Sequence, residues 1–211
     1  CSSDLTIGDR IYNKGRFPKN EWLRVHSASD GLASGTVTSN NLTSTPNFNG
    51  GQIVLNKNAW VIDVGNITSH SGGTIGYSGT SAHYRARVHH GFFIQNHINT
   101  LTQFGDWMFN GTTKRLTMQF GSQNPANYVV RASSIDDVVV INGRANVIIE
   151  NLSIQGSNRT AIRLIGSGAR NITIRNCDIL KNGNDGIFMD GTGGHPDGLI
   201  VENSLFEDTK N

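Results

Sequence analysis

The sequence contains few of the residues that would cross-link a small fold or give it a strong charge. Its 211 residues include two cysteines, four prolines and only 16% charged residues, with a formal net charge of +2. Two cysteines make no disulfide framework, and scattered charges make no basic stripe of the kind that binds nucleic acid. No apolar run approaches the roughly 20 residues of a membrane-spanning helix. We therefore expect neither a nucleic-acid partner nor a membrane span.

Tracts of helix-forming residues are also missing. No long stretch is dominated by Ala, Leu, Glu and Lys, whereas Val, Ile, Thr, Ser, Asn and 25 glycines recur along the chain. This composition is typical of many short strands joined by turns. It predicts an all-β protein.

The first five residues, Cys1–Leu5, allow two interpretations. Cys1 followed by two serines resembles the mature start of a bacterial lipoprotein, where the cysteine carries lipid. A common sequencing-adapter end, translated in one frame, also encodes residues 1–5. We expect the second origin, so we treat residues 1–5 as an addition and the rest as a fragment that begins and stops inside a fold. Cys177 is then a lone thiol, expected to be buried as a small apolar residue.

Three segments in the last third of the chain align without gaps. They begin at Asn146, Asn171 and Gly198, and these starts are 25 and 27 residues apart. Such a period suits one coil of a β-solenoid. Residues 125–211 are therefore predicted to form a right-handed parallel β-helix, in which side chains alternate inward and outward along each strand.

The repeat assigns apolar columns to the inside of the solenoid. The inward columns are Val147, Ile172 and Leu199; Ile149, Ile174 and Val201; and Ile154, Ile179 and Phe206. A second strand in each coil aligns Ala161–Ile165 with Gly186–Asp190, and Val138–Ile141 takes the same place one coil earlier.

Asn151, Asn176 and Asn203 form a column of their own. Coils stack about 4.8 Å apart, so amides in one column can hydrogen-bond up the stack as an asparagine ladder. Asparagine also tolerates the left-handed backbone of a tight corner. We expect these three residues to be structural.

Residues before 125 lack the 25-residue period. Strand-like runs alternate with turns, and Asn110-Gly111 between two such runs predicts a hairpin. The Ser-, Thr- and Asn-rich segment Leu32–Asn49 is expected to be a surface loop. Antiparallel hairpins with polar turns favour a small β-sandwich.

Several segments together resemble a group of bacterial right-handed parallel β-helix proteins of the pectin-lyase-like type. The matching segments are Arg16–Asn20, the strand pair Gln52–Val64, Leu101–Phe109 and Lys114–Met118. The resemblance implies an antiparallel β-sandwich inserted between coils, and its members include β-xylosidase-like and other glycoside hydrolases. The expected division is an edge of the β-helix at residues 6–25, the insert at 26–124 and the β-helix at 125–211.

The candidate catalytic residues are carboxylates of the last two coils. Glycosidases use two carboxyl groups, about 5 Å apart in retaining enzymes or about 6.5–9.5 Å apart in inverting ones. Asn184-Asp185-Gly-Ile is similar to the Asn-Thr-Asp-Gly segment of polygalacturonases. The candidates are Asp185, Asp190, Glu207 and Asp208. The alternative is that these are ordinary turn residues, since Asp and Asn before Gly are common in turns.

No cofactor is expected. The histidines of the first half show no tight ligand spacing, so no metal site is predicted. A polysaccharide lyase would need clustered carboxylates for Ca²⁺ and a basic residue, and the sequence shows no such cluster.

The expected function is that of a secreted, periplasmic or cell-surface carbohydrate-active protein. The leading hypothesis is a glycoside hydrolase that acts on a plant-type or other polysaccharide or oligosaccharide. The alternatives are a non-catalytic β-helix for glycan binding or adhesion, and a polysaccharide lyase. The chain itself is expected to be inactive, because its candidate acids would need partners beyond Asn211.

Overall fold

The computed structural model describes residues 5–208, which divide into two compact units. Unit 1 comprises residues 1–12 and 126–211, and unit 2 comprises residues 13–125. Unit 2 is therefore inserted into the sequence of unit 1. Apart from strands, the described residues include two short 3-10 helices, η1 (Ile98–Thr100) and η2 (Pro125–Asn127).

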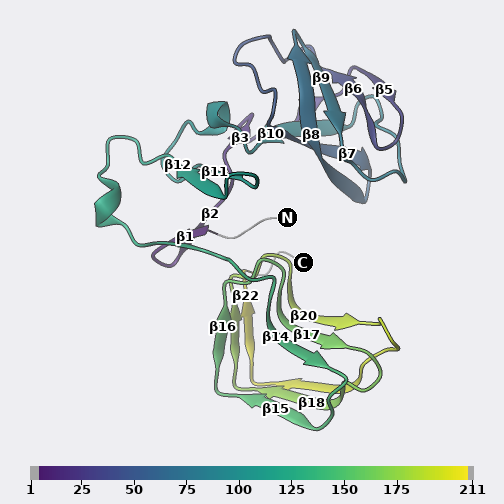
Figure 1. The fold of residues 1–211 in the computed structure, drawn as a ribbon, viewed down its shortest axis with the longest axis vertical. Helices are drawn as coiled ribbons and strands as arrows, with labels where there is room; N and C mark the ends of the chain where they lie inside the picture. The colour runs from purple at the N-terminus through teal and green to yellow at the C-terminus, as the bar shows by residue number, and fades with distance from the viewer. Residues whose placement is uncertain (1–4, 209–211) are drawn as a thin grey trace. The chain divides into compact units, whose positions relative to one another are not determined.

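The β-helix of unit 1 consists of three parallel sheets that enclose one core (Figure 1). The first sheet contains β14 (Asp137–Asn142), β17 (Thr160–Ile165) and β20 (Asp185–Asp190). The second contains β15 (Val147–Glu150), β18 (Arg170–Arg175) and β21 (Asp197–Glu202). The third contains β16 (Ser153–Gln155), β19 (Asp178–Leu180) and β22 (Leu205–Glu207).

The observed strand register matches the columns predicted from the sequence. Val147 pairs with Ile172, which pairs with Leu199. In the third sheet, Ile154 pairs with Ile179. The remaining predicted columns are also confirmed, because the register aligns Ile149, Ile174 and Val201; Ile179 and Phe206; Ile162 and Ile187; and Leu164 and Met189.

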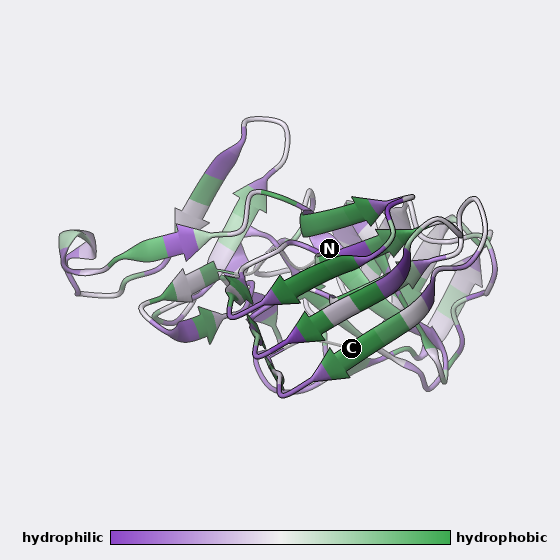
Figure 2. Cartoon of the chain, turned by 90° about the horizontal axis from the view of Figure 1, so that it is seen from below, coloured by the Kyte–Doolittle hydropathy of each residue, from purple (hydrophilic) through white to green (hydrophobic). Residues whose placement is uncertain are grey.

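The inward columns form the core of the β-helix. Ile162, Ile172 and Ile179 are fully buried, and Cys177 lies in the same cluster as a buried free thiol. Figure 2 shows the corresponding apolar stretches along the strands and hydrophilic turns between them. In the last described coil the inward side chains are more exposed, because no further coil covers them among residues 5–208; Val201, for example, is 41% exposed.

The three asparagines of the predicted corner column have left-handed backbone. Asn151, Asn176 and Asn203 have φ angles of 59°, 51° and 48°. The backbone N–H of Asn151 donates to Arg175 O, and that of Asn176 donates to Glu202 O, both at 3.2 Å. A hydrogen bond between side-chain amides occurs at a different column, where Asn171 Nδ2 donates to Asn146 Oδ1 at 3.1 Å. The corner column thus acts mainly through its backbone conformation.

A small antiparallel sheet precedes the coils of unit 1. It consists of β1 (Leu5–Ile7), β2 (Arg10–Tyr12) and β13 (Val130–Ala132), in the order β13-β1-β2. Leu5 is 1% exposed and pairs with both Tyr12 and Ala132. Leu5, expected to be part of an added segment, therefore takes part in the fold, and residues 1–4 lie outside the described residues.

Unit 2 is built on one antiparallel sheet of eight strands. Its order is β3-β10-β7-β8-β9-β6-β5, and β4 pairs with β10. The strands are β3 (Arg16–Phe17), β4 (Leu23–Arg24), β5 (Ser27–Asp30), β6 (Ser34–Thr38), β7 (Gln52–Asn58), β8 (Val61–Ser71), β9 (Thr74–Ser78) and β10 (Gly91–Gln95).

The sheet of unit 2 closes on itself around its core. β4 pairs with β10 at one end of the sheet, and β5, which follows two residues later, pairs with β6 at the other end. The core inside includes Phe48, Ile53, Ile75 and Phe92, all fully buried. The antiparallel insert is therefore barrel-like, a closed relative of the expected sandwich.

Two expected boundaries differ from the structure. β6 lies within Leu32–Asn49, which was expected to be a loop, because its sequence Ser-Gly-Thr-Val-Thr forms a polar strand that exposes one face. Unit 2 begins at residue 13 rather than 26, since β3 and β4 pair with β10 of the same sheet.

The predicted hairpin is present at Asn110-Gly111, between β11 (Trp107–Asn110) and β12 (Arg115–Met118). It follows a loop that carries Asp106, which is ion-paired with Lys19. The Asp106 carboxylate also accepts the backbone N–H groups of Thr102 and Gln103 at 2.8 and 2.9 Å. Two of the segments that carry the family resemblance therefore meet in one partly buried polar contact.

Candidate functional site

Asp185 and Asp190 lie at opposite ends of one strand. Asp185 begins β20 and Asp190 ends it, so their Cα atoms are about 16 Å apart along the strand. Asp185 accepts a hydrogen bond of 2.8 Å from Asn184 Nδ2. A pair of glycosidase carboxyls requires at most about 9.5 Å. These two residues therefore do not form a catalytic pair with each other.

Glu207 and Asp208 belong to a different side of the β-helix. Glu207 ends β22 in the third sheet, where it is exposed and pairs with Leu180. Asp208 follows in the turn with a left-handed φ of 55°. The structure therefore distributes the four predicted carboxylates over two sheets and three strand ends.

A charged cluster that the sequence did not predict lies on the first sheet. Arg163 of β17 bridges two carboxylates from the neighbouring coils, Asp137 of β14 and Asp190 of β20. Its Nη1 lies 3.1 Å from Asp137 Oδ2, and its Nη2 donates to Asp190 Oδ2. Arg159 also donates to Asp137 Oδ2, at 2.7 Å. We call Asp137, Arg159, Arg163 and Asp190 the arginine cluster.

The arginine cluster keeps both of its carboxylates ionised at neutral pH. Burial alone would raise the pKa of Asp137, but hydrogen bonds from Arg159 and Arg163 outweigh this effect and lower it. Hydrogen bonds from Arg163 and Thr192 lower the pKa of Asp190 to about 2. A general acid must hold a proton near the working pH. Neither carboxylate can therefore act as a proton donor while the cluster is intact.

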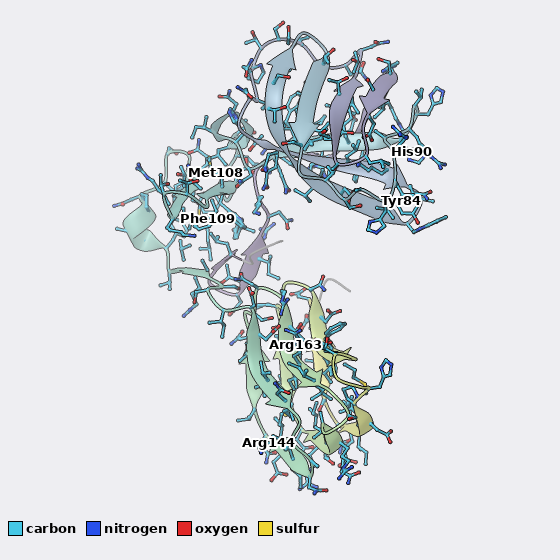
Figure 3. The ribbon with its side chains drawn as sticks, turned by 45° about the vertical axis from the view of Figure 1, so that its right-hand side comes forward. Tyr84, His90, Met108, Phe109, Arg144 and Arg163 are labelled. Atoms are coloured by element: carbon cyan, nitrogen blue, oxygen red, sulfur yellow. The ribbon has the colours of Figure 1, made fainter. Side chains whose placement is uncertain are left out.

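Exposed apolar side chains flank the arginine cluster. Arg163 pairs across the sheet with Val140 on one side and Phe188 on the other, so the three side chains share the outward face. Val140 is 51% exposed and Phe188 is 43% exposed. Figure 3 labels Arg163 on this part of unit 1. A flat outward face thus presents planar polar groups beside an aromatic ring.

A polar cavity of about 410 Å³ lies elsewhere in unit 1. It is formed by the β1–β2 turn, the end of β13 and the turns that follow β16 and β19, and it is lined by Thr6, Gly8, Asp9, Arg131, Ala132, Ser133, Gln155, Gly156 and Lys181. Lys181 Nζ lies 3.8 Å from Asp9 Oδ1 across it. None of the four predicted carboxylates lines this cavity.

Among residues 5–208, no three His, Cys, Asp or Glu side chains gather in a way that could hold a metal ion. Over the same residues, no helix has the length and apolar character needed to cross a membrane.

Comparisons with known proteins agree with this architecture. Residues 122–211 match the family model described as "Right handed beta helix region". A solved structure titled "Glycoside hydrolase" superposes with a TM-score of 0.65 at 12% sequence identity, over 94% of this chain and 48% of that one. The chain thus spans about half the length of that protein. A search of curated proteins gives no match. At this identity the structural likeness concerns the fold, and residues 122–211 are a right-handed β-helix region.

Proposed function

We propose that this chain belongs to a carbohydrate-active β-helix protein and that the outward face of the β14–β17–β20 sheet binds a polysaccharide chain. The observation that carries the proposal is Arg163, held between two ionised carboxylates and flanked by an exposed Phe188. Guanidinium and carboxylate groups in fixed geometry can hydrogen-bond paired sugar hydroxyls. An exposed aromatic ring can pack against the apolar face of a sugar.

The spacing of the sheet supports an extended ligand. Equivalent side chains of adjacent coils repeat about every 4.8 Å, so a glycan running across the strands would meet equivalent positions at each coil. The structure titled "Glycoside hydrolase" supports the same class of ligand, by fold only. The parent protein is then a glycoside hydrolase that acts outside the cell, in the periplasm or at the cell surface.

Non-catalytic glycan binding is the second candidate. It is supported by the ion pairs that hold Asp137 and Asp190 to Arg163, because a binding site needs fixed polar groups but no proton donor. Hydrolysis of the same oligosaccharides that bind would favour the enzyme over the binding module. Binding without turnover is expected of both candidates, because this chain is itself expected to be inactive.

The test is oligosaccharide binding measured by calorimetry on two matched variants. We expect Arg163→Ala to weaken the binding of xylan, arabinan or pectin oligosaccharides about tenfold or more, as loss of a central anchor does. Arg175→Ala is the control, since Arg175 forms a 2.6 Å ion pair with Glu150 on the second sheet. Equal affinity of Arg163→Ala and the unchanged protein would contradict the proposal.

A further inference from the structure

The outer face of the unit 2 sheet carries side chains in two ordered rows. Ile53 of β7 and Ile94 of β10 are fully buried in the core, so the residues that alternate with them point outward. Because cross-strand partners share a face, the register of β3, β10, β7 and β8 shows which outward side chains are neighbours.

The first row is polar. Arg16 pairs with Gln95, Gln95 pairs with Gln52, and Gln52 pairs with Asn66. Gln95 Nε2 lies 3.4 Å from Gln52 Oε1. We call Gln95, Gln52 and Asn66 the amide row, which continues the line that starts at Arg16. The four strands that carry these residues span about 14 Å. Each side-chain amide has an NH2 group that donates and a C=O group that accepts, so it can bind a sugar hydroxyl, which also donates and accepts.

The second row is apolar and aromatic. Phe93, Val54 and Val64 are cross-strand partners in the row next to the amides; Val54 is only 6% exposed, whereas Val64 is 38% exposed. Trp22 packs edge-to-face on Phe93, with ring centroids 4.9 Å apart. A Cβ at Gly91 would lie within 2.9 Å of the Trp22 indole, so only glycine lets the indole lie against the strand. Trp22 remains 38% exposed.

Arg16 fixes this aromatic group in place. Its guanidinium lies 3.8 Å from the centre of the Phe93 ring, and its Nε donates to Pro18 O at 2.9 Å. Nη2 donates to Glu21 O at 2.5 Å. These contacts tie the segment that carries Trp22 to the sheet. The indole is therefore a preorganised platform, and the charge of Arg16 is already engaged within the protein.

We propose that this face of unit 2 is a second glycan-binding surface, which takes a neutral, extended oligosaccharide with Trp22 as its stacking platform and Gln52, Gln95 and Asn66 as its hydrogen-bonding groups. A neutral ligand fits because the amide row carries no charge and Arg16 is occupied. The class of ligand rests on the proposed function, whereas the surface itself lies in unit 2 and shares no residue with the arginine cluster.

The experiment measures binding of xylan and arabinan oligosaccharides and of charged pectin fragments to the full chain. We expect Trp22→Ala and Gln52→Ala each to weaken binding of a neutral oligosaccharide about tenfold, while Trp22→Phe retains most of it. Phe109→Ala is the control, because Phe109 is 37% exposed on the separate β11–β12 hairpin, where Figure 3 labels it. Thermal melting establishes that each variant is folded.

The outcomes separate this proposal from the one for unit 1. Loss of binding in Trp22→Ala that adds to the loss in Arg163→Ala supports two surfaces. Loss in Arg163→Ala alone overturns the surface on unit 2 and leaves the proposed function standing. A change in self-association without any change in glycan binding would show that the face contacts protein, which also overturns it. Absence of binding to every oligosaccharide overturns both proposals.

Discussion

A fully buried lysine in unit 2 allows a quantitative test of the fold. The side chain of Lys57 has no exposed surface, and its Nζ donates to Leu32 O, to Thr80 Oγ1 at 2.8 Å and to Ser81 O at 3.3 Å. The carboxylates of Asp30 and Asp63 lie 3.8 and 3.7 Å away. One ammonium group thus satisfies three oxygens and offsets two carboxylates that are almost buried.

Replacing Lys57 by Met keeps most of the side-chain volume and removes the charge. The two carboxylates then lose the cation between them, and Thr80 Oγ1 and Ser81 O lose its hydrogen bonds, while Leu32 O keeps the hydrogen bond from Thr80 Oγ1 at 3.0 Å. Removing one partner of a buried ion pair costs about 3–5 kcal/mol. The unfolding midpoint of unit 2 should therefore fall by more than about 10 °C. Adding Asp30→Asn should recover part of the loss, because it removes one of the two uncompensated charges.

Tryptophan fluorescence reports on this change selectively. All three tryptophans of the chain, Trp22, Trp60 and Trp107, lie in unit 2. Urea unfolding followed by tryptophan emission therefore measures unit 2, while the β-helix does not contribute to that signal. If the free energy of unfolding of Lys57→Met lies within about 1 kcal/mol of that of the unchanged protein, the prediction is wrong. Lys57 and its two carboxylates then do not stabilise the barrel, and leaving the carboxylates unpaired does not carry the expected cost.

Three further predictions concern unit 1. Arg163→Gln should raise the pKa of Asp190 from about 2 towards 3.8, which NMR titration of the carboxyl group would measure. Because the pKa of Asp190 is depressed in the folded protein, the ion pair with Arg163 stabilises the fold above about pH 3.8. This stabilisation is lost as the pH falls through about 2. Asn176→Ala should destabilise the β-helix by about 1–2 kcal/mol because its φ of 51° is left-handed, whereas Asn176→Gly should be tolerated, as circular dichroism during denaturation would show. The chain should not hydrolyse xylan, arabinan or pectin oligosaccharides, because Asp185 and Asp190 lie about 16 Å apart and cannot act as a catalytic pair; turnover above background that Asp185→Asn abolishes would contradict this.

The β-helix could be predicted residue by residue because its repeat encodes the register. The apolar positions in Val147–Glu150 and Arg170–Arg175 align without gaps, and alternation along a strand then determines which side chains point inward. The same logic could not find the closure of unit 2. That closure depends on pairing of β4 with β10, residues far apart in sequence, and no repeat marks such a pairing.

The arginine cluster shows why the site was harder to predict than the fold. Asp137 and Asp190 lie in different coils, and only the position of Arg163 between them brings the two carboxylates into one network. A sequence motif such as Asn184-Asp185-Gly attracts attention locally, but these contacts run across coils. An outward arginine among the apolar residues Ala161–Ile165 was the one signal in the sequence that could have indicated the cluster.

Register determines where a side chain points, whereas burial depends on what covers it. Ile149, Ile174 and Val201 share one inward column, yet their exposed fractions are 8%, 0% and 41%. Ile174 is fully buried because a coil lies on each side of it, and Val201 has a described coil on one side only. The outward faces follow the opposite rule, since their side chains stay exposed however many coils are added. Each added coil therefore buries more of the interior and, by the same repeat, lengthens the exposed outer face.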